Sequence, residues 1–345
     1  MQALRSPLDA ARRQRLVLAL LCGCALLAMA AAGLAGSVAL PLAELPGAVR
    51  EMVQGRAEGM AATLLDLRLG RASSAFVTGA SLSLAGVMMQ ALVRNPLADP
   101  YVLGISSGAA VGALGALFAG AALWMVDAGA LAGAVGISLL LYVLARRDLG
   151  TRREAASDTG TLLLTGVVLA SACMALVTLL LSVAPDSRLR GMVFWMIGDL
   201  AGSSWRLLPW LVLAAALALA LRRAGALNVL ALHADAAVAL GVDVGALRRF
   251  LFACSGVLTA CAVTTGGAIG FVGLVVPHAC RFAFGADHRV LLPASALAGG
   301  SFLVVADTLA RTVIAPQQLP VGVITSLIGV PVFLFQLHQL HLRRP

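Results

Sequence analysis

Residues 73–93 read SSAFVTGASLSLAGVMMQALV, and this stretch carries no charged side chain. A helix of roughly 20 apolar residues is long enough to cross the hydrocarbon core of a bilayer. A polar turn with two prolines follows at residues 94–100, RNPLADP, and the next apolar stretch begins at Val102. Asn-Pro ends one helix, and Asp-Pro sets the start of the next. The pattern therefore predicts two membrane-spanning helices joined by a rigid turn.

Further apolar stretches continue this pattern in both directions along the chain. Their lengths predict about ten transmembrane helices in a single all-α membrane domain over residues 1–345. Besides Ser73–Val93 they are Leu16–Leu34, Val102–Val126, Ala128–Leu144, Thr161–Val183, Leu207–Leu221, Phe250–Thr265, Gly270–Phe284, Leu291–Ala310 and Val321–Leu337. The segment Gly266–Phe284 contains several glycines and a proline, so we expect a broken or re-entrant helix there.

Composition supports a membrane class and argues against a soluble one. The chain is 60% hydrophobic and only 12% charged, with a mean hydropathy of +0.96. A soluble fold of this length could not cover such a sequence with polar surface, whereas a bilayer is itself an apolar solvent. The 36 glycines favour helices that approach one another closely.

The net charge of +9 comes from arginines that cluster in short groups between the apolar stretches. This distribution is typical of cytoplasmic loops, and it disfavours nucleic-acid binding. With the N-terminus inside, the larger share of the arginines falls on the inner side. The bias predicts a multi-pass membrane protein with both termini in the cytoplasm.

Two connections are longer than simple turns. The outer one, Gly36–Arg71, mixes acidic and basic residues and is expected to be a loop. The inner one, residues 222–249, has apolar residues at mixed three- and four-residue spacing, which predicts short amphipathic helices. Such helices suit either the membrane surface or the docking of a cytoplasmic partner, and the pattern alone does not separate these two modes.

Motifs for catalysis are absent from the sequence. It has no Walker A pattern, no Gly-x-Ser-x-Gly turn and no His-Glu-x-x-His pair. We therefore expect no enzyme activity, no metal site and no cofactor on this chain, and any ATP with Mg²⁺ would act on another subunit.

An ion-coupled secondary transporter is the alternative, but it needs intramembrane acids as relays. Asp307 is the best candidate for such an acid, and Arg311 follows it four residues later. That spacing favours a simple ion pair on one helix face.

Six long stretches, in order along the chain, carry a resemblance to a known family. They are residues 68–113 (RLGRASSAFVTGASLSLAGVMMQALVRNPLADPYVLGISSGAAVGA), 194–205 (FWMIGDLAGSSW), 228–244 (NVLALHADAAVALGVDV), 266–281 (GGAIGFVGLVVPHACR), 287–311 (DHRVLLPASALAGGSFLVVADTLAR) and 318–335 (QLPVGVITSLIGVPVFLF). With them the chain resembles the permease subunits of the iron-chelate, haem and vitamin B12 ABC importers, the type II importer fold.

The resemblance implies a homodimer in the bacterial inner membrane, with the substrate pathway on its two-fold axis. It also implies two ABC ATPase subunits on the cytoplasmic side and a periplasmic substrate-binding protein on the other. The implied function is ATP-driven import of a large iron chelate or cobalamin. Haem is placed slightly ahead of a ferric siderophore, and cobalamin comes next.

The resemblance further implies roles for individual residues. The segment that docks the ATPase would contain Asn228, Leu230, Ala231, Leu232, His233, Ala237, Leu240 and Gly241. The cytoplasmic gate would be formed by Asn95, Leu97, Thr159 and Gly160. Docking of the binding protein would fall to Arg68, Arg71 and Arg311, because bidentate arginine–carboxylate pairs give orientation as well as attraction.

Overall fold

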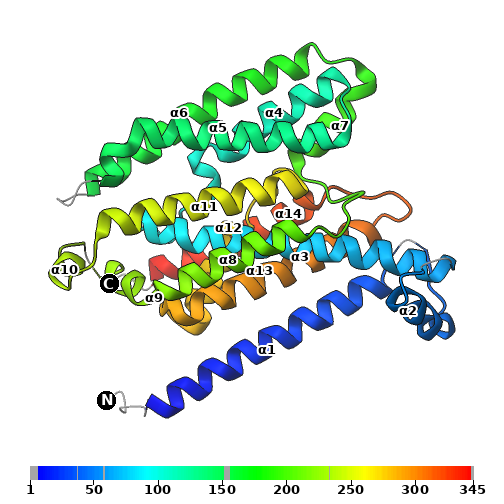
Figure 1. The fold of residues 1–345 in the computed structure, drawn as a ribbon, viewed down its shortest axis with the longest axis horizontal. Helices are drawn as coiled ribbons and strands as arrows, with labels where there is room; N and C mark the ends of the chain where they lie inside the picture. Colours follow the sequence, from blue (N-terminus) through cyan, green and yellow to red (C-terminus); the bar gives the residue numbers. More distant parts are fainter. Residues whose placement is uncertain (1–6, 37, 57–58, 151–155, 233, 343–345) are drawn as a thin grey trace.

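The computed structural model describes residues 7–36, 38–56, 59–150, 156–232 and 234–342. Within these ranges the regular structure is helical, with no strand, so the all-α prediction is confirmed (Figure 1). The helices are α1 (Pro7–Leu34), η1 (Leu42–Glu44), α2 (Leu45–Val53), α3 (Met60–Val93), η2 (Pro100–Leu103), α4 (Ile105–Ala119), α5 (Leu123–Gly150), α6 (Ala156–Ser182), α7 (Asp186–Ile197), α8 (Leu207–Arg222), α9 (Ala224–Leu230), α10 (Ala234–Ala239), α11 (Val244–Gly266), α12 (Val272–Phe284), α13 (His288–Thr312) and α14 (Val321–Leu342).

The helices match the predicted spans closely. Seven in the described part of the chain are long and apolar enough to cross a membrane, namely α1, α3, α5, α6, α11, α13 and α14. Helices α8 and α9 form an eighth candidate that is bent by 63°, and α4 and α12 are shorter apolar helices. Counted together, these helices account for the ten predicted segments.

The structure corrects two boundaries. Helix α3 begins at Met60 instead of Ser73, so helix replaces much of the loop expected over Gly36–Arg71. Its first turns carry charged side chains that signal a loop in sequence, yet Arg68 binds backbone oxygens of the protein and Arg71 pairs with Asp307. The stretch expected to run from Val102 to Val126 is divided, because α4 ends before Gly120, whose φ of 71° is left-handed.

The break expected within Gly266–Phe284 is confirmed. Helix α11 ends at Gly266, and α12 begins at Val272 after a turn that contains Phe271 with a φ of 69°. A left-handed phenylalanine is unusual. The turn lies against other protein segments, where irregular backbone at membrane depth is tolerated.

Helix α3 is the central element of the bundle. In its most apolar window, 89% of the residues are buried inside the chain. It packs against α11, α12 and α13, and Figure 1 shows it behind α8 in the middle of the molecule. Helices α4 to α7 form a separate layer. This layer meets the rest of the bundle mainly where α5 packs against α11.

Two glycine pairs at a spacing of four residues join α4 to α5. A Cβ at Gly108 would lie 2.6 Å from the carbonyl oxygen of Gly133, and one at Gly129 would lie 2.6 Å from that of Gly112. The two backbones therefore touch, as in small-xxx-small helix pairs of membrane proteins. This contact is the close approach that the glycine content predicts.

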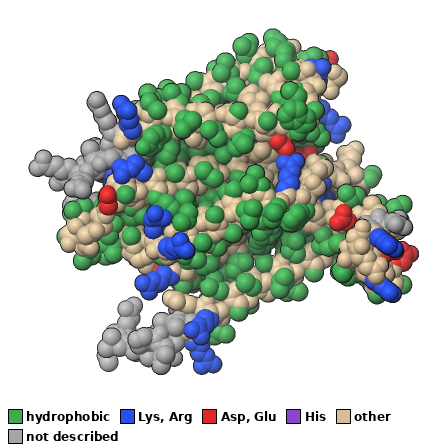
Figure 2. Space-filling view, in the orientation of Figure 1, with side chains coloured by type: hydrophobic (Ala, Val, Ile, Leu, Met, Phe, Trp, Pro, Cys, Tyr) green, Lys and Arg blue, Asp and Glu red, His purple; other side chains and the backbone are tan. Residues whose placement is uncertain are grey.

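The polar groups gather at the two ends of the bundle. Figure 2 shows hydrophobic side chains over the flank and most basic side chains toward the ends. The start of α1, the end of α14 and helices α9 and α10 all lie at one end, while α2 lies at the other (Figure 1). We call these the α9 end and the α2 end.

Candidate functional sites at the two ends of the bundle

Helices α9 and α10 form a short helical pair at the α9 end. The chain bends by 63° between α8 and α9. After α10, Gly241 adopts a φ of 79°, and the Asp243 carboxylate then caps α11 by accepting the amide of Ala246 at 3.0 Å. The expectation of short amphipathic helices in this connection is confirmed.

The residues predicted to dock the ATPase fall into two groups in the structure. Leu230 and Ala237 are buried and hold the helical pair against the bundle. Leu232 and Leu240 are 65% and 68% exposed, and Ala231 and Gly241 are also exposed. His233 lies outside the described residues. The exposed group thus forms an apolar surface at the tip of the molecule.

Asn228 ties this helical pair to the start of α13. Its side-chain amide donates to Asp287 Oδ1 at 2.8 Å. Its carbonyl oxygen accepts the backbone amide of His288 at 2.9 Å and lies 2.7 Å from His288 Nδ1. Both the nitrogen and the oxygen of the Asn228 side-chain amide therefore bind residues at the start of α13.

Asp287 is the N-cap of α13 and accepts the amide of Arg289 at 3.0 Å. Burial alone would raise its pKa. The hydrogen bonds from Arg289 and Asn228 and the nearby positive charge outweigh that effect, so the pKa lies below its ordinary value. Sequence reasoning missed this contact. Asp287 has the position of a helix cap, but nothing in the sequence indicates a partner 59 residues away.

The turn between α3 and α4 is held by its own polar side chains. The Asn95 side chain accepts the amide of Leu97 at 2.9 Å, and Asp99 accepts that of Tyr101 at 2.7 Å. The Tyr101 hydroxyl then donates to the carbonyl oxygen of Ile269 at 3.0 Å, which fixes the turn to the break before α12. The rigid turn predicted from RNPLADP is confirmed.

The predicted gate is incomplete within one chain. Asn95 and Leu97 share the turn, whereas Thr159 and Gly160 lie in the first turns of α6. Gly160 is exposed, and in the part of the chain that the structure describes no atom lies within 4 Å of where a Cβ would sit, apart from its own helix turn and chain neighbours. The side chain of Thr159 lies outside the described part of the structure. The gate role of these residues stays a prediction.

We expect the stability of the chain to depend on pH through Asp99. Burial raises the pKa of this carboxyl from 3.8 to about 6, against the opposing hydrogen bond from the Tyr101 amide. The folded state therefore favours the protonated acid. This stabilisation is complete below pH 3.8 and is lost as the pH rises through about 6. Asp99→Asn keeps the acceptor but cannot ionise, so its stability relative to the unmodified chain should increase between pH 5 and pH 8. Unfolding temperatures at both pH values test this, and a difference that does not change with pH would contradict it.

A buried ionic cluster lies toward the α2 end. Arg71 binds Asp307 through two nitrogens, with Nε 3.0 Å from both carboxylate oxygens and a terminal nitrogen 2.8 Å from Oδ1. Arg311 Nε lies 3.2 Å from the other oxygen, so the predicted pair between Asp307 and Arg311 is confirmed. Gln318 accepts a further hydrogen bond from Arg71 at 2.8 Å. The Asp307 carboxylate thus joins α13 to α3 through Arg71, and it also pairs with Arg311 on its own helix.

The third predicted docking residue, Arg68, binds backbone oxygens instead. It donates to Leu34 at 2.8 Å and to Val38 at 2.5 Å, which closes the end of α1 onto α3. All three predicted arginines are buried, at 5–8% exposure. They line one side of a cavity of about 570 Å³ whose other walls include residues 202–205. A partner side chain could reach them through this cavity, and their docking role stays a prediction.

Comparison with known proteins gives the family. Residues 24–339 match the model of the FecCD transport family. The chain is 43% identical to the cobalamin import system permease protein BtuC of Halobacterium salinarum, over 80% of this chain and 73% of the relative. It is 41% identical to the vitamin B12 import system permease protein BtuC of Escherichia coli, over 79% and 82% of the two chains.

A solved structure has the same fold. It is described as an inward-facing ABC transporter assigned to the metal-chelate type, and it superposes with a TM-score of 0.79 at 29% identity. The superposition covers 94% of this chain and 99% of the other. The resemblance seen in six sequence stretches is confirmed: the chain belongs to the FecCD transport family and is a permease subunit of an ABC importer.

Proposed function

We propose that this permease imports a large metal-containing corrinoid or chelate, with cobalamin as the first candidate. The two BtuC relatives, named for cobalamin and vitamin B12, support this order. The order expected from the sequence placed haem and siderophores first. The solved structure assigned to the metal-chelate type supports haem and siderophores as further candidates.

The proposed pathway lies between two copies of the chain. Helix α6 supports this arrangement, because it carries a row of exposed apolar side chains, including Leu164, Val168 and Leu179. Helix α14 likewise exposes Leu334 and Phe335. In a homodimer the second copy would complete the space that stands open beside Gly160. A weakly binding apolar wall suits a bulky substrate that must pass without being held.

The proposed coupling surface is the exposed apolar patch of Leu232 and Leu240 on the helical pair at the α9 end. This surface carries the proposal, because it projects beyond the bundle and is tied to α13 through Asn228. Movement of a docked ATPase would displace α13 directly. ATP and Mg²⁺ would bind to that ATPase and not to this chain.

The remaining contacts follow from that orientation. The α9 end, with both chain termini, would face the cytoplasm, and the α2 end would face the binding protein across the inner membrane. The cavity beside Arg68, Arg71 and Arg311 has a positive wall, because these arginines outnumber the acids Asp66 and Asp307. Acidic side chains of a binding protein would suit it.

We expect Leu240→Glu to reduce ATP-driven uptake by about tenfold or more. The substitution removes a leucine that the docked ATPase would bury, and it adds a carboxylate that must be desolvated on docking. A loss of about 1.4 kcal/mol in binding free energy already corresponds to a tenfold change in affinity. The assay is uptake of labelled cobalamin into proteoliposomes that contain the permease, its ATPase and its binding protein. Co-purification of the ATPase with the permease measures ATPase association.

The matched control is Val53→Glu, the same change at an exposed position of α2, which should leave ATPase association intact. Equal losses of ATPase association in both variants would contradict the coupling surface. Uptake of haem or a siderophore in place of cobalamin would overturn the substrate proposal alone. Uptake driven by an ion gradient without the ATPase would overturn the coupling proposal.

A further inference from the structure

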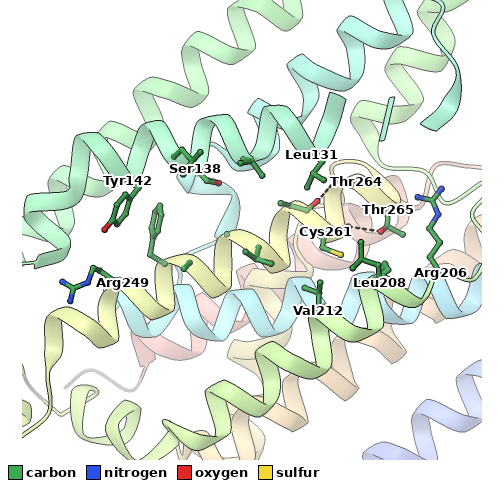
Figure 3. Close-up of a pocket in the computed structure, with 18 residues that line it drawn as sticks. Leu131, Ser138, Tyr142, Arg206, Leu208, Val212, Arg249, Cys261, Thr264 and Thr265 are labelled. Atoms are coloured by element: carbon green, nitrogen blue, oxygen red, sulfur yellow. Dashed lines mark hydrogen bonds between the residues drawn. The ribbon is translucent and has the colours of Figure 1, made fainter. Parts of the chain in front are cut away.

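A groove runs along the flank of the bundle, with α11 as its floor and α5 and α8 as its walls (Figure 3). Its volume is about 430 Å³, within the range of about 300–1,000 Å³ that is typical of small-molecule sites. The lining is almost entirely apolar between its two ends. Leu139 on one wall and Leu208 on the other are both largely exposed, so the groove is open to the hydrocarbon region.

Small side chains on α11 create the depth of this groove. Ala253, Gly256 and Ala260 recur at three- and four-residue spacing and lie on its floor. Val257, on the same helix, is 54% exposed and also lines the groove. An extended acyl chain fits such a floor, because it needs length and apolar contact but no hydrogen bonds.

The two ends of the groove differ in charge. At the α2 end, Arg206 is neutralised by Asp127 at 2.6 Å. At the α9 end, Arg249 is exposed and makes no hydrogen bond or ion pair with any residue whose side chain the structure describes. The Tyr142 hydroxyl lies at this same end (Figure 3), and it also has no hydrogen-bond partner in the described part of the chain.

The sequence adds positive charge beside the free arginine. Arg222 ends α8 at the α9 end and Arg223 follows it, with the Arg223 guanidinium 4.0 Å from the centre of the Phe250 ring. Basic residues next to a membrane attract anionic lipid headgroups, and long arginine side chains extend from apolar surface to the headgroup level. One end of the groove therefore complements an anionic headgroup, and the other does not.

We propose that this groove binds an anionic phospholipid from the leaflet at the α9 end. The lipid phosphate is held by Arg249 and the Tyr142 hydroxyl, and one acyl chain lies on the α11 floor between α5 and α8. In the orientation proposed above, this leaflet is the cytoplasmic one. The bound lipid connects the layer of α4 to α7 with the central bundle, because one wall of the groove, α5, belongs to that layer and the other wall, α8, belongs to the bundle.

Native mass spectrometry of the purified full chain tests the site. Phosphatidylglycerol and phosphatidylcholine with identical acyl chains are the two probes. We expect the unmodified chain to retain phosphatidylglycerol more strongly. Arg249→Gln should weaken that retention about fivefold, as expected for about 1 kcal/mol per basic side chain near the membrane surface, and should weaken phosphatidylcholine retention less, because its choline cation offsets the charge of the phosphate.

The matched control is Arg222→Gln, which removes the same charge at the same end but does not line the groove. Equal losses in Arg249→Gln and Arg222→Gln would show a diffuse charge effect and overturn the site. Val257→Trp fills the groove from an exposed position and should lower the retention of both lipids. Unchanged lipid retention in this variant would overturn the proposal. The readout is lipid binding, so it is independent of substrate and coupling.

Discussion

Asp307→Ala is expected to destabilise the chain by about 3–5 kcal/mol, the usual cost of removing one partner from a buried ion pair. The carboxylate side chain is 1% exposed and neutralises Arg71 and Arg311 at the same time. Its removal leaves two buried guanidinium groups without a counter-charge. The free energy of unfolding in mixed micelles, measured by denaturant titration, checks this result.

Two companion variants identify the cause. Asp307→Asn keeps the shape and one acceptor but removes the charge, so an intermediate loss is expected. Asp127→Ala breaks the Arg206 pair at the protein surface, where the side chains are 49% and 30% exposed, and exposed pairs contribute only about 0–1 kcal/mol. Equal losses for Asp307→Ala and Asp127→Ala would disprove the role of burial.

Gly86→Ala is the second large effect that we expect, with a loss of about 1–3 kcal/mol from overpacking. A Cβ on Gly86 would collide with the carbonyl oxygen of Gly273, so α3 and α12 touch backbone to backbone. The Gly273 backbone cannot move out of the way of the added methyl group, as the end of a flexible side chain could. The helices must separate, and the turn before α12 moves with them.

Gly136→Ala on α5 is the matched control. Among the described residues, no atom lies within 4 Å of the site of its Cβ, leaving aside its own helix turn and chain neighbours. Alanine in a helix interior is favoured over glycine by roughly 0.5–1 kcal/mol, so this variant should be as stable as the unmodified chain or more stable. The same unfolding titration compares the two, and a similar loss in both would refute the close contact at Gly86.

The sequence predicts most spans because a membrane helix is encoded locally. The apolar runs that begin at Thr161 and Val321 match the starts of α6 and α14 within a few residues. The turn of residues 94–100 is predicted for the same reason, since Asn95 and Asp99 bind amides two residues away.

Features that depend on distant partners were not predictable. The first turns of α3 look like a loop because Asp66, Arg68 and Arg71 are charged, and Asp307 lies 236 residues from Arg71. Helix α7 was missed for a similar reason, because Asp186, Arg188 and Arg190 mark its start as polar.

The division of the coupling segment also depends on three-dimensional packing. Leu230 and Leu240 are the same residue type, yet one is buried and the other is exposed. Periodicity gives the helices, but it does not say which face meets the bundle. The anchoring role of Asn228 likewise needs the position of α13, which no local pattern supplies.

The two polar anchors of α13 imply a preferred bilayer thickness. His288 meets Asn228 at one end of the helix, and Asp307 meets Arg71 near the other. At 1.5 Å per residue, the helix rises about 28 Å between them. This distance is close to the thickness of a typical hydrocarbon core, about 30 Å. Lipids with much shorter or longer acyl chains would force α13 to tilt, at a cost of a fraction of a kcal/mol per Å of mismatch. Acyl-chain length should therefore change the position of the α9 end relative to the headgroups without any change in the protein.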